Sequence, residues 1–108
     1  MKAWEIWSYK PNGWAEPHPA VIVSHPDRVA NKPEFNVLVC SSKRAQGAPM
    51  PNEVVWDSND GLCWPALCEC DMFHAVHVAE LSNRRGVVTS ERRKLIISTI
   101  MRANGWTP

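Results

Sequence analysis

The sequence predicts a small, mostly β domain, a β-rich α+β fold built as an antiparallel barrel with one helix at its C-terminal end. Short apolar stretches rich in β-branched residues alternate with clusters of Pro, Gly, Asn and Asp, which is typical of strands joined by turns. No helical stretch separates successive strands in the way that a parallel βαβ sheet requires. Six Trp and nine Pro among 108 residues also favour a sheet with stiff loops over a helical bundle.

Length and charge narrow the class of protein further. We expect one domain spanning residues 1–108, because this length fits a single compact core. Charged residues make up 21% of the chain and nearly cancel, to a net charge of +1, so a nucleic-acid site has to be local rather than a general basic surface. The sequence contains no apolar run of about 20 residues and no signal-peptide pattern, so we expect a cytoplasmic protein without a membrane partner.

Three strands are predicted in the first half of the chain. The first covers residues 4–9 and ends at turn formers in residues 11–13. The apolar run at 20–24 is typical of a strand buried on both faces, and a short helical turn is expected after it, before Pro33. The third strand covers residues 37–40 and leads into a loop rich in Gly, Ala and Pro.

Three further strands and a helix are predicted in the second half. Residues 53–56 and 85–88 are short strands, and residues 66–74 between them alternate in polarity. Ala66, Cys68, Cys70 and Met72 are expected on a core face, and Leu67, Glu69, Asp71 and Phe73 on the opposite face. Thr89 or Ser90 can cap a final helix that stops at Asn104-Gly105. Its apolar stripe comprises Leu95, Ile96, Thr99, Ile100 and Ala103.

Six short segments, spread over nearly the whole chain, carry a family resemblance. They are Ile6-Trp7, the run from Pro19 to Ser24, Ser41-Ser42-Lys43, Gly61-Leu62, Cys70-Asp71 and the final amphipathic helix. In this order they resemble the MazF/PemK toxins of type II toxin-antitoxin systems, within the CcdB/PemK-like superfamily. The resemblance implies an SH3-like barrel, a homodimer, and ribosome-independent, metal-independent cleavage of single-stranded mRNA without a cofactor. It also implies a cognate antitoxin whose disordered C-terminal tail occupies the RNA groove.

The resemblance implies a catalytic set of four residues that departs from the family pattern. His18 stands where members usually carry an Arg, and Glu69 stands where PemK-like members carry an Arg two residues before the strand Asp, here Asp71. Ser41 stands in place of the usual Thr after the third strand. The hydroxyl group and the Asp are thus retained in type, whereas both guanidinium groups are lost.

The implied reaction is attack of a ribose 2′-hydroxyl on the adjacent phosphate, which needs a base, an acid and a cation. We hypothesise that Glu69 is the base, that His18 is the acid, and that Lys43 or Arg44 supplies the cation. The alternative is a catalytically degenerate PemK-like module that binds a partner peptide or nucleic acid without cleaving it. The absence of both arginines favours this alternative, whereas the retained Ser41 and Asp71 favour cleavage.

Trp14 completes a predicted RNA-binding set with Lys43 and Arg44. It lies on a polar, Pro-rich loop, where the indole is suited to stacking on a base. The structural alternative is a lid that packs over the barrel mouth or against a dimer partner. Residues 92–94 are cationic and lie at the predicted start of the helix, where positive charges oppose the helix dipole, so they do not serve the stability of the helix. We interpret them as a solvated face, although they also suit phosphate binding.

The cysteines and the later histidines are interpreted as structural. Cys63, Cys68, Cys70 and His74 can be drawn as a zinc site. However, Cys68 and Cys70 are roughly 6.6 Å apart along a strand, whereas structural zinc usually takes ligands from turns, so we expect free thiols and no metal. His74 and His77 flank a predicted strand end, where surface or core positions are more common than catalytic ones.

Overall fold

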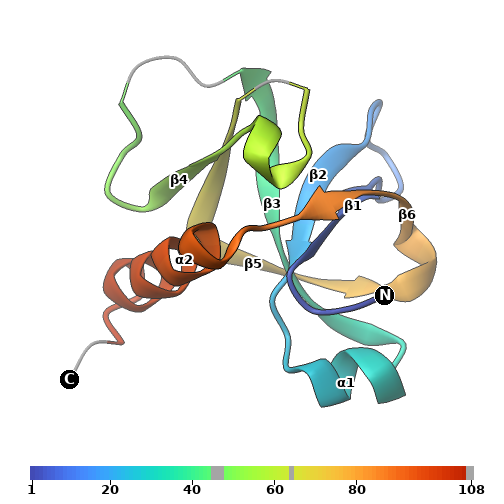
Figure 1. The fold of residues 1–108 in the computed structure, drawn as a ribbon. Helices are drawn as coiled ribbons and strands as arrows, with labels where there is room; N and C mark the ends of the chain where they lie inside the picture. Colours follow the sequence, from blue (N-terminus) through green and yellow to red (C-terminus); the bar gives the residue numbers. More distant parts are fainter. Residues whose placement is uncertain (45–47, 64, 107–108) are drawn as a thin grey trace.

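The computed structural model describes residues 1–44, 48–63 and 65–106, except for the side chains of residues 42–44. The strands of these parts are β1 (Glu5–Tyr9), β2 (His18–Ile22), β3 (Glu34–Arg44), β4 (Glu53–Trp56), β5 (Ala66–His77) and β6 (Leu81–Val87) (Figure 1). The helices are α1 (Pro26–Asn31) and α2 (Ser90–Ala103), with 3₁₀ turns at Ser58–Asp60 and Val78–Glu80. Among the described residues, no helix is long and apolar enough to cross a membrane.

The strands form one antiparallel sheet in the order β4-β5-β3-β2-β1-β6, so the predicted β-rich fold with a C-terminal helix is confirmed. The predicted barrel is wrong, because the edge strands β4 and β6 do not pair with each other in the described sheet. Helix α2 packs against β4 and β5 instead and covers that end of the core (Figure 1). The sheet is still strongly curved. The rings of Tyr9 on β1 and His74 on β5 are 6.1 Å apart, whereas three strand spacings in a flat sheet would separate their strands by about 14 Å.

Strands β2, β3 and β6 begin earlier than the sequence predicts, because pairing continues past their apolar centres. Strand β2 begins at His18, which pairs with Tyr9 on β1. Strand β3 has eleven residues, and its polar first residue Glu34 still pairs with His77 at the end of β5. Strand β6 begins at Leu81 rather than at residue 85. Hydrogen bonding to the neighbouring strands thus outweighs the low strand propensity of these polar residues.

Strand β5 alternates as predicted only in its first half. Cys68 pairs with Cys40 of β3. Five residues further along β5, Phe73 pairs with Leu38, which is only two residues from Cys40. Leu38 and Cys40 are two residues apart, so their side chains lie on one face of β3, and their partners Phe73 and Cys68 lie on that same face of the sheet. The prediction placed Phe73 and Cys68 on opposite faces, and a bulge in β5 between them accounts for the difference. Met72, which was expected in the core, lies in the bulge and is 53% exposed.

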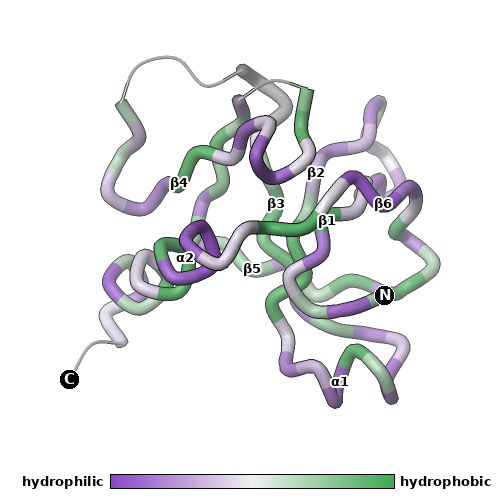
Figure 2. The backbone as a smooth tube through the Cα atoms, viewed as in Figure 1, coloured by the Kyte–Doolittle hydropathy of each residue, from purple (hydrophilic) through white to green (hydrophobic). Residues whose placement is uncertain are grey.

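Apolar side chains cover both faces of the sheet, and Figure 2 shows hydrophobic colours through its central strands. The first cluster, the α2-side core, includes Ile6, Val21, Leu38, Cys40, Trp56, Cys68 and Ile96. The second, the α1-side core, includes Tyr9, Ala20, Ile22, Phe35, Val37 and Val76. Strand β2 contributes to both cores, which confirms the predicted burial of its two faces.

Helix α2 is capped by Thr89, one of the two predicted cap residues, whose hydroxyl accepts the backbone N–H of Arg92 at 3.1 Å. Two members of its predicted apolar stripe, Ile96 and Thr99, are buried. Leu95 is 43% exposed. Consecutive helical residues point about 100° apart, so Leu95 faces away from the core that Ile96 enters.

Arg92 joins α2 to the turn after β4, so it is not part of a solvated face. Its Nε donates to Oδ2 of Asp60 at 3.1 Å and its Nη2 donates to Oδ2 of Asp57 at 3.2 Å. Asp60 is 1% exposed, and its Oδ2 also accepts the backbone N–H of Asp57 at 3.0 Å. Arg93 is engaged as well, with its guanidinium 5.3 Å from the ring centroid of Trp4. These cations therefore stabilise the packing of the helix.

Glu5 connects β1 to β6 near the N-terminus. Its carboxylate accepts the Arg84 Nε at 2.7 Å, the Lys2 backbone N–H at 2.7 Å and the Trp7 Nε1 at 3.2 Å. Burial raises the pKa of the Glu5 carboxyl, but these three donors and the Arg84 charge lower it more, so the net pKa lies below its usual value. The ionised form of Glu5 is thus the one that stabilises this edge of the sheet.

Candidate functional site

His18 occupies the start of β2, and its tautomer is set by a neighbouring strand. Its ring Nδ1 lies 3.3 Å from the carbonyl oxygen of Cys40 on β3. A carbonyl oxygen can only accept, so Nδ1 carries a proton, and in the neutral imidazole Nε2 keeps its lone pair. This arrangement leaves Nε2 as the ring atom that can take a proton from a substrate.

Ser41 and Glu69 lie on the same face of the sheet as His18. The register between β2 and β3, continued by two residues, sets His18 level with Ser41. Glu69 follows Cys68, which enters the α2-side core, so alternation directs Glu69 to the opposite face. Strand β3 lies between β2 and β5, whose axes are therefore about 10 Å apart. The structure thus brings three predicted residues to one face.

Asp71, the fourth predicted catalytic residue, lies in the β5 bulge toward the β4 edge. Its Oδ1 accepts a hydrogen bond from Nδ2 of Asn52 at 3.1 Å. The adjacent Cys70 backbone N–H donates to the Asn52 carbonyl at 2.8 Å. Since the bulge interrupts alternation, the predicted face shared by Glu69 and Asp71 no longer follows from their spacing.

Trp14 packs from the β1–β2 loop onto the face that carries His18. Their ring centroids are 4.7 Å apart and their planes meet at 63°. Tyr9 and His74 also make edge contacts with the same indole, at 5.5 and 6.5 Å between centroids. We call these four residues the aromatic cluster. Trp14 is half-buried, so it both packs against the α1-side core and keeps part of its ring open to solvent.

His74 belongs to this cluster, although the sequence prediction did not place it in the site. It was expected near a strand end, but β5 continues to His77, and the pairing of His74 with Val37 directs it toward the α1-side core. No local pattern reveals this, because the aromatic neighbours of His74 lie on β1 and on the β1–β2 loop. Only the curvature of the sheet brings them together.

The predicted RNA-binding cations Lys43 and Arg44 belong to the end of β3. The backbone of Arg44 pairs with Ala66, so β3 continues beyond Ser41 as an ordered strand. The side chains of Lys43 and Arg44 lie outside the described part of the structure. Their role as the site's cations stays a prediction.

The cysteines are free thiols, of which Cys40, Cys68 and Cys70 are buried and Cys63 is exposed. Burial raises the pKa of the Cys40 and Cys68 thiols, and hydrogen bonding to Cys68 together with burial raises the pKa of Cys70. A thiol held in its neutral form is a poor nucleophile and a poor metal ligand. Within the described residues, no group of three or more His, Cys, Asp or Glu side chains is placed to hold a metal ion.

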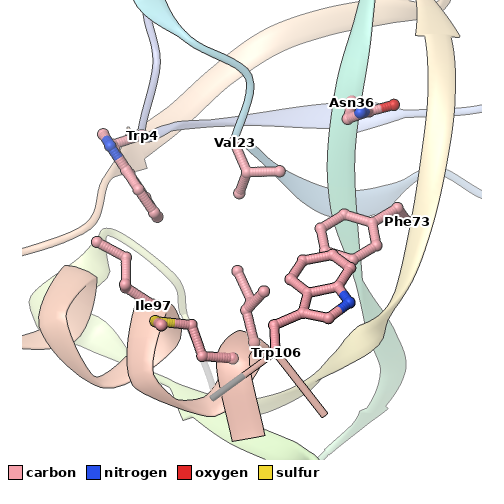
Figure 3. A pocket seen from close by; sticks show the side chains of 8 residues that line it. Trp4, Val23, Asn36, Phe73, Ile97 and Trp106 are labelled. Carbon is pink, nitrogen blue, oxygen red and sulfur yellow. The ribbon is translucent and has the colours of Figure 1, made fainter. Parts of the chain in front are cut away.

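An apolar groove of 540 Å³ lies between α2 and the sheet (Figure 3). It is lined by Trp4, Val23, Asn36, Phe73, Ile97, Ile100, Met101 and Trp106. The rings of Phe73 and Trp106 stack at one side, with centroids 5.9 Å apart and planes 13° apart. Trp106 is 59% exposed and Ile97 is 42% exposed, so this part of the chain presents a continuous apolar surface.

The curved antiparallel sheet with a C-terminal helix on one face has the fold of MazF toxins. A mycobacterial endoribonuclease solved with its cognate antitoxin aligns with a TM-score of 0.84 at 18% identity, covering 100% of this chain and 98% of that one. The Mycobacterium tuberculosis toxin MazF-mt6 aligns with a TM-score of 0.77 at 17% identity, covering 92% and 94% of the two chains.

A chain from a MazE–MazF complex of Deinococcus radiodurans aligns with a TM-score of 0.75 at 14% identity, covering 97% of this chain and 95% of that one. No family model matches the sequence, and no curated protein matches it. These likenesses confirm the predicted MazF-type fold. The chemistry of the site is determined by the side chains of this chain.

Proposed function

We propose that this chain is the toxin of a type II toxin-antitoxin system and acts as an endoribonuclease on single-stranded mRNA, independently of the ribosome and of metal ions. The observation that carries the proposal is the position of His18. Its Nε2 is left available by the Cys40 carbonyl, it lies beside Trp14, and it is level with Ser41. The fold shared with solved endoribonucleases supports this function.

In the proposed reaction, the 2′-hydroxyl of one nucleotide attacks the adjacent phosphorus. His18 Nε2 accepts the hydroxyl proton, which is the reverse of the acid role that the sequence suggested for this residue. The Ser41 hydroxyl donates a hydrogen bond to a non-bridging phosphate oxygen, where negative charge increases. Trp14 stacks on a base and thereby positions the attacking ribose. Glu69 and Asp71 remain proposed members of the site, and Lys43 or Arg44 is the proposed cation.

The apolar groove supports the proposal of a homodimer. Ile97, Met101 and Trp106 expose apolar surface around it, and such surface is commonly covered by another protein chain. Ile97→Arg is expected to shift the protein from dimer to monomer in light scattering, whereas Lys94→Ala on the same helix leaves it dimeric. We also propose that the protein is cytoplasmic and that a cognate antitoxin with a disordered C-terminal tail inhibits it. An antitoxin partner is supported by the similar solved structures, one of which is an endoribonuclease with its cognate antitoxin and another a MazE–MazF complex.

Cleavage of a long single-stranded RNA in the presence of a metal chelator tests the proposed activity. His18→Ala is expected to reduce the cleavage rate by about 10² to 10⁴-fold, as is typical for loss of a general base. His25→Asn is the matched control, because His25 is exposed and Asn keeps an acceptor for the backbone N–H of Asp27 at the start of α1. Intact RNA at a large excess of wild-type protein would show that the proposed activity is absent.

The degenerate binding module remains the second candidate function. It is favoured by the absence of an Arg at positions 18 and 69, since neither His18 nor Glu69 provides a permanent cation for a phosphate. This candidate predicts that the wild-type protein binds a labelled RNA or a peptide tail and leaves RNA uncut. Cleavage that depends on His18 rules it out.

A further inference from the structure

The aromatic cluster contains a second imidazole that the sequence prediction did not use. We propose that His74 is the general acid of the candidate site and works with His18 as the base, an assignment that rests on the proposed RNA cleavage. The two histidines come from β2 and β5, which β3 separates, and they meet at the same indole because the sheet is curved.

The contacts with Trp14 limit the distance between the two imidazole rings to a span that one phosphate can bridge in an in-line displacement. Their centroids lie 4.7 and 6.5 Å from the Trp14 centroid, so they are at most about 11 Å apart. A phosphate placed between a base and an acid needs roughly 9 to 10 Å between the two ring nitrogens, since each hydrogen bond spans about 3 Å. When a nucleobase stacks on the solvent-exposed part of the Trp14 ring, the adjacent phosphate is within reach of both imidazoles.

His74 completes the proton balance of the reaction. His18 Nε2 takes the proton of the 2′-hydroxyl while the 2′-oxygen forms a bond to phosphorus. The bond from phosphorus to the 5′-oxygen of the next nucleotide breaks, and the protonated His74 gives its proton to that oxygen. The products are a 2′,3′-cyclic phosphate and a free 5′-hydroxyl, and neither an oxidant nor a metal takes part.

An imidazole suits the acid step better than the nearby carboxylates. It holds a proton that it can release near neutral pH, whereas an ionised carboxylate only accepts hydrogen bonds. His74 is half-buried, so it can both pack against the indole and reach a substrate. Asp71 is held by Asn52 toward the β4 edge.

A sulfur-substituted substrate separates an acid from a residue that only supports the fold. In an oligoribonucleotide with one 5′-bridging phosphorothiolate, sulfur replaces the leaving oxygen, and a thiolate departs without protonation because thiols are far more acidic than alcohols. We expect His74→Ala to slow cleavage of the ordinary RNA by about 10² to 10⁴-fold and to cleave the sulfur substrate at about the wild-type rate. His18→Ala is expected to slow cleavage of both substrates.

The controls distinguish failure of this assignment from failure of the proposed function. His74→Gln keeps the size of the side chain, and thermal unfolding of both variants reports whether the cluster still packs. His77→Asn, three residues further along β5, keeps an acceptor for the Ala79 backbone N–H and is expected to cleave both substrates normally. Equal losses of His74→Ala on the two substrates, or no loss on either, would overturn the acid assignment alone. Wild-type protein that cleaves neither substrate would overturn the proposed function and this assignment together.

Discussion

Loss of the Arg92 side chain is expected to destabilise the fold strongly, because Arg92 pairs with the buried carboxylate of Asp60. In Arg92→Met, the fully buried Asp60 carboxylate keeps only the Asp57 backbone N–H as a donor, because its Oδ1 has no hydrogen-bond partner among the described residues. Breaking a buried ion pair on one side costs about 3 to 5 kcal/mol. This is a large share of the roughly 5 to 15 kcal/mol that stabilise a typical domain. We therefore expect a loss of about 12 °C or more in the melting temperature.

Urea unfolding monitored by Trp fluorescence measures this loss directly. Arg93→Met is the matched control, because the Arg93 guanidinium lies over the Trp4 ring and forms no ion pair among the described residues, and removal of such a cation–π contact costs about 0.5 to 1 kcal/mol. In the Arg92→Met background, Asp60→Asn is expected to recover part of the stability, since it removes the unpaired buried charge. If Arg92→Met costs no more than Arg93→Met, the Arg92 contacts are those of an ordinary surface ion pair and the reasoning is refuted.

Three further predictions follow from single contacts. The pKa of Glu5 in the folded protein lies below its reference value of 4.5. Its stabilising contribution is therefore complete above the unfolded pKa and is lost as the pH falls through the folded pKa. Glu5→Gln should flatten the acid limb of the curve of stability against pH, and an unchanged limb would contradict this. Gly86→Ala places a Cβ on the Asp60 carbonyl oxygen and should cost about 2 to 3 kcal/mol in urea unfolding. Gly13→Ala meets no atom within 4 Å and should cost only its backbone strain, about 1 to 2 kcal/mol, so a smaller loss at Gly86 would refute the clash. Trp14→Ala should weaken binding of a short, uncleavable RNA by about 1 to 3 kcal/mol in fluorescence anisotropy, and unchanged affinity would exclude stacking on this ring.

The sequence predicts those parts of the fold that depend on neighbouring residues along the chain. The apolar run at 20–24 predicts a doubly buried strand, and Thr89 predicts the start of α2, because both depend on short-range patterns. The bulge in β5 is instead a property of two strands, because more residues of β5 than of β3 lie between the same two paired positions. Met72 and Phe73 fit the alternating pattern of their own strand, so only the pairing partner reveals that the alternation breaks there.

The residues of the candidate site also fall into those that the sequence predicts and those that only the three-dimensional structure reveals. His18 and Ser41 were predicted because the family resemblance assigns their positions, and the register sets them level on adjacent strands. His74 was not predicted as a site residue, because its contact with Trp14 requires a sheet curved enough to bring β5 toward the β1–β2 loop. Sequence spacing along a strand carries no information about such curvature.

A His at position 18, where the family resemblance leads one to expect an Arg, changes the source of positive charge in the proposed reaction. An arginine supplies a permanent positive charge, whereas a histidine that acts as a base becomes positive only after it has taken the proton. The Cys40 carbonyl, 3.3 Å from Nδ1, accepts the proton on that ring nitrogen, so a proton from the substrate would go to Nε2. The indole of Trp14 makes an edge contact with this imidazole, with ring centroids 4.7 Å apart, and holds it at the site. In the proposed reaction, the positive charge would form beside the phosphate at the step in which the negative charge on its oxygens increases, so His18 would supply both the base and, after proton transfer, part of the charge that an arginine would provide.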